Sequence, residues 1–298
     1  MVPKLLLVAF IPIMVSRTVA QSPGIHHWPL NEEGGTVAID HAGTSHGTLV
    51  GGAEWAPDDG YFAGAARFNG VQARIETGPC DLVNGAGAIS ITAWVKPDLV
   101  TGMERTLIAK ANGPDDHVWS LAIVNATALR FRLLAAGQLV ELASSPSLIT
   151  SGIWYFIAAT YDGTEARLYV NGSMIASAPV TGTIGHHPGV PVAMGALHNG
   201  QHAFSGWMDD VRIHDQGLND MDVLALLFEN VSVGIDQIAP ALGRPYHIEL
   251  LDTQGRVLDR SVTYPDTTGR WPEEWSTGVH LVRMVAPGGT TTRRVFIP

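Results

Sequence analysis

In Arg167-Leu-Tyr-Val-Asn-Gly-Ser-Met-Ile-Ala176, an Asn-Gly dipeptide separates two short alternating runs. Alternation with a period of two is typical of a β-strand that has one buried face. Asn-Gly is the favoured dipeptide of the type I′ turn, which joins two antiparallel strands. The segment therefore predicts a β-hairpin with its turn at Asn171-Gly172.

Strand patterns continue on both sides of this hairpin. An aromatic and β-branched run from Trp154 to Tyr161 adds a third consecutive strand, and residues 89–96 and 129–133 alternate as well. Only residues 219–229 have a helical pattern, with Asn219 in the N-cap position. We therefore expect an all-β fold, an antiparallel β-sandwich followed by one short helix.

The composition agrees with many short strands. The chain has 298 residues, 46% of them hydrophobic and 15% charged, with 33 Gly and 18 Pro as turn formers. Further strand patterns lie beyond a boundary near residues 229–234. We expect a β-sandwich domain at 21–230 and a second, small β-domain at 231–298.

Residues 1–20 have the pattern of a secretory signal peptide. Lys4 precedes an apolar run from Leu5 to Val15, and small residues precede Gln21. The apolar run is shorter than the roughly 20 residues that span a bilayer, so we expect export without a transmembrane segment. The only cysteine, Cys80, excludes an intrachain disulfide, so the core or a metal must hold the fold together.

The charge of the chain limits its partners. Removal of residues 1–20 would take away two basic residues and no acid, which leaves 16 basic and 28 acidic residues and a net charge of −12. This charge argues against nucleic acid or an anionic membrane as a partner. Residues 231–298 contain seven Arg and seven acids, so the acidic excess lies in the first region.

Residues 25–228 resemble the laminin-G-like jelly-roll module of the concanavalin A-like lectin and glucanase superfamily. The resemblance implies an antiparallel jelly-roll β-sandwich. It rests on motifs that follow one another along the domain: Trp28-Pro-Leu-Asn-Glu-Glu-Gly-Gly35, Gly64-Ala-Ala-Arg-Phe-Asn-Gly70, Ile91-Thr-Ala-Trp-Val-Lys96, Leu168-Tyr-Val-Asn-Gly172 and Phe204-Ser-Gly-Trp-Met-Asp-Asp-Val-Arg-Ile213.

Residues 246–297 are similar to the C-terminal sorting domain of cargo proteins of the type IX secretion system. The similar segments are Leu251-Asp-Thr-Gln-Gly-Arg256, Gly278-Val-His-Leu-Val-Arg283 and Arg293-Arg-Val-Phe-Ile297, whereas the Tyr-Pro-Asn-Pro opening common in that family is missing. The resemblance implies that the type IX machinery recognises this domain and delivers the protein to the bacterial cell surface.

Asp209 is the candidate metal ligand. In a regular strand it would share an apolar face with Trp207 and Val211, and a buried carboxylate needs backbone donors, an Arg or a cation. Oxygen-rich surroundings favour Ca²⁺, and the resemblance implies a structural Ca²⁺ held by Asp209 and by the main chain near Gly64. The alternative is that Asp209 only accepts hydrogen bonds from backbone N–H groups. Asp210 is expected in a surface ion pair with Arg212.

No catalytic motif is evident in the sequence. Sandwich glycosidases place paired carboxylates at strand spacing, whereas the acidic pairs of this chain, such as Asp58-Asp59 and Asp115-Asp116, are adjacent and lie in turn-rich contexts. The sequence also lacks a Gly-x-Ser-x-Gly elbow and a Gly-rich phosphate loop.

Polar strand faces instead suggest a binding surface. Trp94 and Tyr169 fall on the polar sides of their strands, and Arg130 and Arg132 share one side of theirs. If these strands share a sheet, aromatic rings and guanidinium groups line one solvated face, as a sugar-binding surface requires. We expect an exported, non-catalytic module that binds carbohydrate or an adhesion partner such as a cell-surface glycoconjugate. The alternative is a polysaccharide hydrolase or lyase with an unrecognised active site.

Overall fold

The computed structural model describes residues 25–98, 103–125, 127–228, 246–251, 257–263, 278–286 and 289–297. The predicted signal peptide and the predicted domain boundary near 229–234 lie outside the described residues.

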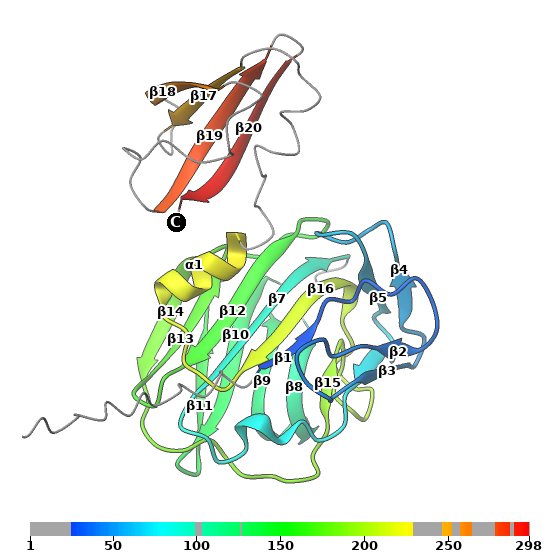
Figure 1. The fold of residues 1–298 in the computed structure, drawn as a ribbon. Coiled ribbons are helices and arrows are strands. Elements are labelled where there is room, and N and C mark those ends of the chain that lie inside the picture. Colours follow the sequence, from blue (N-terminus) through cyan, green and yellow to red (C-terminus); the bar gives the residue numbers. More distant parts are fainter. Residues whose placement is uncertain are drawn as a thin grey trace, which may run out of the picture.

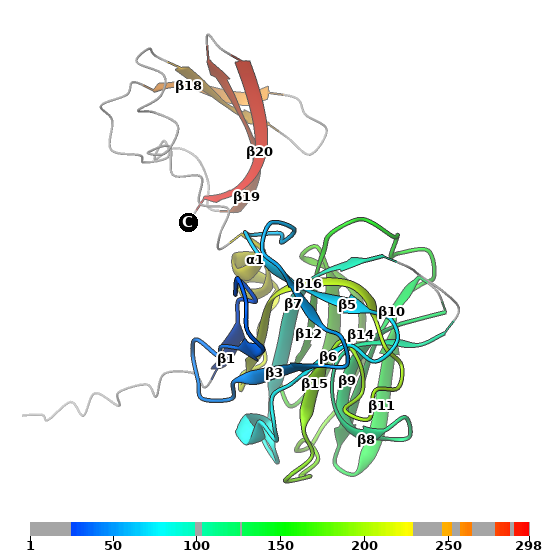
Figure 2. The ribbon, with the colours of Figure 1, turned by 90° about the vertical axis from the view of Figure 1, so that its right-hand side faces the viewer.

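Two antiparallel sheets form the first region, and the views in Figures 1 and 2 show them as two layers. Sheet A has the strand order β14 (Ser173–Pro179), β13 (Glu165–Val170), β12 (Tyr155–Tyr161), β7 (Ile89–Pro97), β16 (Ser205–His214), β5 (Ala65–Asn69) and β4 (Glu54–Ala56), and β1 (Ile25–Trp28) also pairs with β16. Sheet B has the order β11 (Gln138–Ala143), β10 (Ala128–Ala135), β9 (Asp116–Val124), β8 (Arg105–Gly113), β15 (Val192–Met194), β6 (Arg74–Glu76), β3 (Gly47–Val50) and β2 (Val37–Ala38).

The expected β-sandwich is confirmed. The hydrophobic core is made of side chains from both sheets, among them the fully buried Trp28, Phe68, Trp119, Phe131 and Phe204. Burial of aromatic side chains of this size is a main source of folding free energy. A one-turn 3-10 helix, η1 (Asp81–Val83), follows Cys80, whose side chain belongs to the same core.

The predicted hairpin is β13 and β14, with Val170 paired to Ser173 across the turn. Asn171 has a φ of 50° and Gly172 a φ of 77°. A type I′ turn requires positive φ at both central residues, which Asn and Gly adopt more easily than other residues do. The strands β12, β13 and β14 are neighbours in sheet A and form the expected meander.

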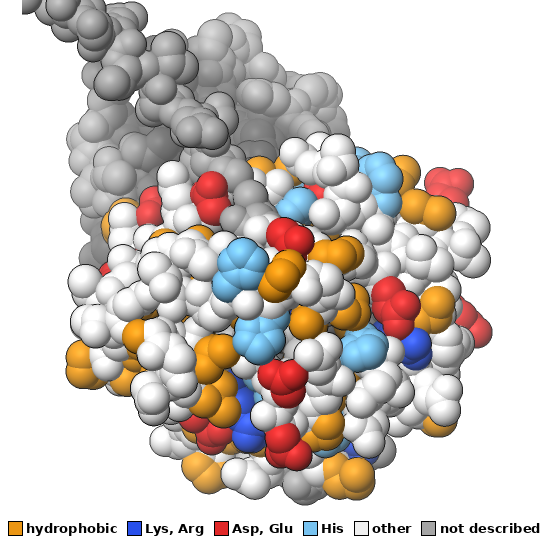
Figure 3. Space-filling view, turned by 90° about the horizontal axis from the view of Figure 1, so that it is seen from below, with side chains coloured by type: hydrophobic (Ala, Val, Ile, Leu, Met, Phe, Trp, Pro, Cys, Tyr) orange, Lys and Arg blue, Asp and Glu red, His pale blue; other side chains and the backbone are white. Residues whose placement is uncertain are grey.

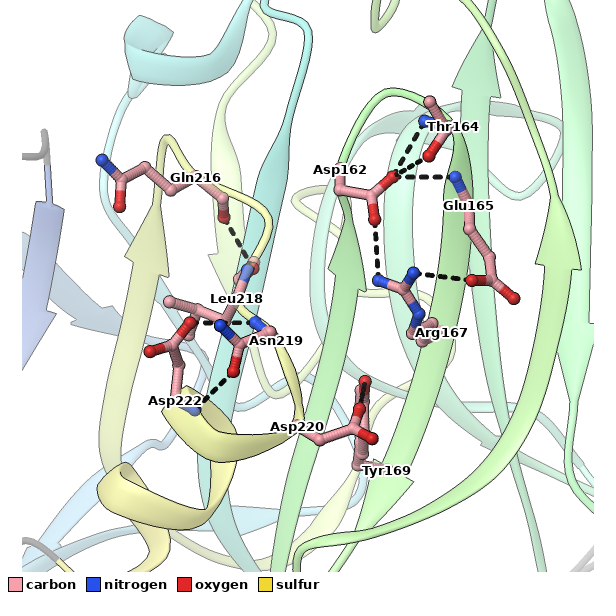
Figure 4. A network of polar contacts seen from close by, with 11 residues as sticks. Asp162, Thr164, Glu165, Arg167, Tyr169, Gln216, Leu218, Asn219, Asp220 and Asp222 are labelled. Atoms are coloured by element: carbon pink, nitrogen blue, oxygen red, sulfur yellow. Dashed lines mark hydrogen bonds and ion pairs between the residues drawn. The ribbon is translucent and has the colours of Figure 1, made fainter.

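The predicted helix is α1 (Asp220–Phe228), and it lies against the outer face of sheet A. Asn219 caps it, because the Asn219 side-chain oxygen accepts hydrogen bonds from the backbone N–H groups of Met221 (2.8 Å) and Asp222 (3.1 Å). Figure 4 shows the contact with Asp222. The Tyr169 hydroxyl donates a hydrogen bond to Asp220 Oδ1 (2.7 Å), which ties the first turn of α1 to β13.

A separate four-stranded antiparallel sheet follows in the C-terminal region. Its strand order is β18 (Val257–Thr263), β17 (Tyr246–Leu251), β19 (Gly278–Ala286) and β20 (Gly289–Ile297). Four strands thus lie in the region where the sequence predicts further strands. Among the described residues, no helix has the length and apolar character needed to cross a membrane.

Candidate functional site

Trp94 and Tyr169 do not line a solvated face, and this expectation is wrong. Their exposed fractions are 3% and 0%. Both lie on the outer face of sheet A, but α1 covers Tyr169 through Val223 and Leu227, and the ring of Tyr61 stacks on Trp94 with 3.4 Å between ring centroids. A ligand cannot stack on either ring in this conformation.

Arg130 and Arg132 lie on the other sheet. They project from the outer face of β10, because the alternate residues Leu129, Phe131 and Leu133 belong to the core. The premise that all four predicted residues share one sheet is therefore wrong, although the two arginines are neighbours as expected. Glu141 on β11 joins them: its Oε2 lies 2.9 Å from Arg132 Nε and 3.7 Å from Arg130 Nε.

A second carboxylate reaches Arg130 from the opposite side. Glu104 Oε1 lies 2.5 Å from Arg130 Nη2 and 3.6 Å from His202 Nδ1. His202 belongs to the segment that follows β15, and its carbonyl accepts a hydrogen bond from the Thr106 backbone N–H (2.8 Å). That bond holds the segment beside the start of β8, which places an imidazole next to the Glu104–Arg130 pair.

Thr106 Oγ1, Ser120 Oγ and His117 Nδ1 are buried polar atoms of β8 and β9 that have no hydrogen-bond partner among the described residues. Ser120 pairs with Arg132 across β9 and β10, so its hydroxyl lies on the same face as the arginines. Buried polar groups in folded proteins nearly always find a partner, in protein or in bound water. Thr106, Ser120 and His117 are 0%, 1% and 4% exposed, so their unpartnered atoms mark places where a buried water would be stabilised.

His117 is neutral near pH 7. Burial, with smaller contributions from the Arg132 and Arg130 cations, lowers the pKa of its imidazole below the usual value. The His117 Nε2 lies 2.7 Å from the Pro114 carbonyl oxygen, which can only accept, so Nε2 carries the proton. The buried Nδ1 atom is then a hydrogen-bond acceptor.

We call this set the sheet B polar face, and it consists of Glu104, Thr106, His117, Ser120, Arg130, Arg132, Glu141 and His202. Guanidinium groups supply donors in fixed directions, and carboxylates and the imidazole supply acceptors. Glu104, His117 and Glu141 were missed in the sequence because they come from three strands or strand ends that are far apart along the chain. No local motif links them.

The Asp209 region differs from the expected regular strand. The register between β16 and β7 shifts between Asp209 and Arg212, and Asp210 has a φ of 49°. This β-bulge moves one residue out of the alternation, so that Met208 and Val211 both point into the core. Asp209 is therefore on the outer face with Trp207, and the expectation that it shares a face with Val211 is wrong.

Asp209 is nevertheless buried, because a loop covers it. Its Oδ2 accepts hydrogen bonds from the backbone N–H groups of Tyr61 and Phe62, both 2.9 Å long. Its Oδ1 is buried and has no hydrogen-bond partner among the described residues. Burial, together with the nearby Asp210 carboxylate, raises the pKa of Asp209 to about 7. The backbone contacts predicted by the alternative reading are present, and the Asp210 backbone N–H also acts on this carboxylate and opposes the rise in its pKa.

Gly64 lies in the same covering loop, two residues after Phe62. Its backbone N–H donates to Asn31 Oδ1 (2.9 Å), and a Cβ atom at this position would lie 3.0 Å from Asn31 Cα. The loop thus carries both the backbone N–H groups that bind Asp209 and, two residues later, the main chain of Gly64.

The expected ion pair between Asp210 and Arg212 is present, but it is buried, so its predicted place on the surface is wrong. The residue is 6% exposed, and its Oδ1 lies 2.6 Å from His27 Nε2 and 3.0 Å from Arg212 Nη2. The bulge turns the side chain toward β1, where His27 pairs with Arg212. These contacts hold the pKa of Asp210 below its usual value despite burial, with His27 and then Arg212 as the main causes.

No group of three or more His, Cys, Asp or Glu side chains that could hold a metal ion is found within the part of the chain that the structure describes. Figure 3 shows that histidine and acidic side chains gather on the face seen from below, where Lys and Arg are few. The many acidic side chains on that face agree with the negative net charge of the chain. The described side chains there include no group of three or more that could hold a metal ion.

A family model described as the concanavalin A-like lectin/glucanases superfamily matches residues 69–224. A search of curated proteins finds no match.

Solved structures share the fold at low sequence identity. The binding domain of Paraclostridial Mosquitocidal Protein 1 is 15% identical with a TM-score of 0.58, and the match covers 88% of this chain and 75% of that one. The structure described as HCR/D W1238A mutant is 15% identical with a TM-score of 0.56, covering 93% and 64% of the two chains. Trypanosoma rangeli sialidase in complex with sialic acid is 18% identical with a TM-score of 0.55, and only 34% of the sialidase chain is covered, against 72% of this one.

Proposed function

Because this chain belongs to the concanavalin A-like lectin and glucanase superfamily, we propose that it is a non-catalytic carbohydrate-binding module. The ligand lies on the sheet B polar face. The family contains both lectins and glucanases, so the choice between binding and catalysis depends on the side chains of this chain.

The observation that carries the proposal is the arrangement around Arg130. Two carboxylates, Glu104 and Glu141, fix the buried Arg130 guanidinium group and its partly exposed neighbour Arg132, and Arg132, Glu141 and His202 are the side chains of this face that a ligand can reach. Sugars present several hydroxyl groups that both donate and accept, and such ligands are bound by a small number of convergent polar groups held in fixed positions. One of the similar solved structures is itself described as a binding domain, which agrees with this role.

The same arrangement disfavours glycoside hydrolysis. A glycosidase of the common type needs one carboxyl group that keeps its proton and a second carboxylate across the scissile bond. Glu104 and Glu141 instead both face guanidinium groups, at 2.5 Å and 2.9 Å respectively. Each is therefore placed to hold an arginine in position.

The test is incubation of the full chain with a panel of immobilised and soluble polysaccharides. Retention on at least one polymer without release of reducing ends over time supports a binding module. Steady release of reducing ends, abolished in Glu104→Gln or Glu141→Gln, would instead establish a hydrolase. Glu165→Gln, which removes a carboxylate that is ion-paired with Arg167 on sheet A, is the matched control.

A structural Ca²⁺ at Asp209 is part of the proposal. The observation that fits a hard cation is Asp209 Oδ1, a buried carboxylate oxygen that has no hydrogen-bond partner among the described residues, since Ca²⁺ prefers oxygen ligands of this kind. Ala63, in the covering loop, has a φ of 101°, and Leu30, in the segment that contacts Gly64, has a φ of 59°. Non-glycine residues adopt such conformations mainly where function or packing requires them.

Export and surface display complete the proposal. Residues 1–20 direct the chain out of the cytoplasm, and residues 231–298 act as the address that the type IX secretion machinery reads. The pattern of a signal peptide and the four C-terminal strands support this role.

A further inference from the structure

The outer face of sheet A carries a cationic and aromatic cluster next to the Asp209 bulge. Trp207 on β16 pairs with Lys96 on one neighbouring strand and with Arg67 on the other. Lys96 Nζ lies 4.1 Å and Arg67 Cζ 4.3 Å from the centre of the Trp207 ring, so both cations contact the indole. Gly206 allows the close approach, since a Cβ at its φ of 147° would lie 2.3 Å from the Lys96 carbonyl oxygen.

The two cations differ in their partners. Arg67 forms an ion pair with Asp98, with 3.2 Å between Arg67 Nη2 and Asp98 Oδ2. Within the described ranges, no carboxylate pairs with Lys96, whose Nζ lies between Trp207 and Trp154, 5.2 Å from the centre of the second ring. An ammonium group that contacts only aromatic rings keeps its capacity to bind an anion.

An aromatic surface adjoins this ammonium group. Tyr61 is 39% exposed and contacts Trp154 edge to face, with 6.2 Å between ring centroids. One face of Tyr61 is stacked on Trp94, and Phe62 contacts the ring at a steep angle, so a ligand contacts the remaining, exposed part of the ring. A pyranose ring could therefore rest on Tyr61 and the partly exposed Trp154 while its substituent reaches Lys96.

We propose that Lys96, Trp154 and Tyr61 form a second binding site, specific for a sugar that carries an anionic group. The carboxylate or sulfate of the sugar accepts hydrogen bonds from Lys96 Nζ, and the apolar face of the ring packs against the aromatic side chains. This site lies on sheet A, apart from the sheet B polar face, and its existence does not depend on the function proposed for that face.

The charge of the molecule limits the size of this ligand. The chain has a formal net charge of −10, so a long polyanion is repelled by the rest of the surface. One cation without an acidic partner suits one anionic residue, such as the end of an oligosaccharide. Binding should accordingly weaken only modestly with salt, because a single charge contact is screened.

The lysine content of the chain allows a direct test. Beyond residues 1–20, the sequence contains only Lys96 and Lys110. Lys110 is fully buried, and its Nζ donates to the carbonyl oxygens of Pro79 (2.5 Å) and Val190 (2.9 Å), so it serves as an unreactive internal control. The full chain is treated with an amine-acylating reagent, and acylation of each lysine is followed by peptide mass spectrometry.

Trigalacturonate or a sulfated galactose trisaccharide should protect Lys96 from acylation, and neutral maltotriose should not. The two anionic sugars distinguish a carboxylate from a sulfate as the bound group. In calorimetric titrations, Lys96→Gln should lower the affinity for the protecting sugar by about tenfold or more, as loss of a hydrogen bond to a charged group implies. Lys96→Arg should retain most of the affinity.

Arg74→Gln removes a cation from β6 of sheet B and is the matched control for net charge. Arg132→Ala should leave the anionic ligand bound, which separates this site from the sheet B polar face. The proposal is overturned if neither anionic trisaccharide protects Lys96, if maltotriose protects it equally, or if Lys96→Gln and Arg74→Gln lower the affinity by the same factor.

Discussion

The Tyr169 hydroxyl group donates its hydrogen bond to Asp220, at the first turn of α1. Tyr169→Phe removes this bond and should lower the free energy of unfolding by about 1 kcal/mol, without a change in glycan affinity, because the ring is fully buried. Chemical denaturation measures the loss. Tyr61→Phe is the matched control, and an equal loss in that variant, or a loss of glycan affinity in Tyr169→Phe, would contradict this assignment.

His214 makes stability depend on pH. Burial and the nearby Arg212 cation lower its pKa to about 4, against 6.5 in an unfolded chain. Between these values the unfolded chain binds the extra proton, so the stabilisation is fully present above pH 6.5 and is lost as the pH falls toward 4. The free energy of unfolding that is lost because of His214 is at most about 3 kcal/mol.

Thermal unfolding of the wild type and of His214→Gln between pH 4.5 and 7.5 measures this contribution. As the pH falls, the melting temperature of His214→Gln should rise relative to that of the wild type. Parallel pH profiles for the two proteins would exclude His214 as the group responsible.

Among the elements, those with a strong local signal were predictable from sequence. Asn171-Gly172 sets the positive φ angles of the hairpin, and Asn219 supplies the side-chain oxygen that begins α1. The bulge in β16 has no such signal, because its residues alternate as those of a regular strand would. Contacts with distant parts of the chain explain the bulge. Asp210 contacts His27 on β1, and Asp209 accepts a hydrogen bond from Tyr61 in a loop about 150 residues earlier.

The bulge and its covering loop are the elements that the proposed Ca²⁺ would stabilise. Ca²⁺ at a free concentration of 100 times its dissociation constant would raise the free energy of unfolding of the wild type by about 2.7 kcal/mol. Asp209→Asn keeps an oxygen that can accept the Tyr61 and Phe62 hydrogen bonds but removes the charge. We expect Ca²⁺ to raise the melting temperature of the wild type and to leave that of Asp209→Asn unchanged.

In excess chelator, Asp209→Asn should be at least as stable as the wild type, because it replaces a buried carboxylate with a neutral side chain. If chelator leaves the wild-type melting temperature unchanged, Asp209 serves only as an acceptor for the two backbone N–H groups.

The buried or exposed state of each strand face was harder to predict than the position of the strand. The alternation in β10 correctly placed Arg130 and Arg132 side by side, because nothing interrupts that strand. The burial of Trp94 and Tyr169 was not predictable from their strands. The segments that cover them, α1 and Tyr61–Phe62, come from distant parts of the chain. The pairing of strands decides which residues of different strands lie side by side. The local sequence of a strand does not show which strand it pairs with.

At the scale of the whole molecule, the core residues of the two sheets that the structure describes lie within 28–213. Deletion of residues 231–298 should therefore leave the melting temperature of the sandwich unchanged. In a host with the type IX machinery, the truncated chain should stay in the periplasm, and a reporter fused to 231–298 should reach the surface. A truncated chain that aggregates or melts much earlier would mean that the C-terminal strands complete the sandwich.

The central claim is that a glycan binds on the sheet B polar face. The most direct measurement is calorimetric titration of a retained oligosaccharide into the wild type, Arg132→Ala and Arg167→Ala. Arg132→Ala should lower the affinity by about 1 kcal/mol or more, roughly fivefold, while the ion-paired control on sheet A binds as the wild type does. Equal affinity of all three proteins for the same ligand would contradict the account.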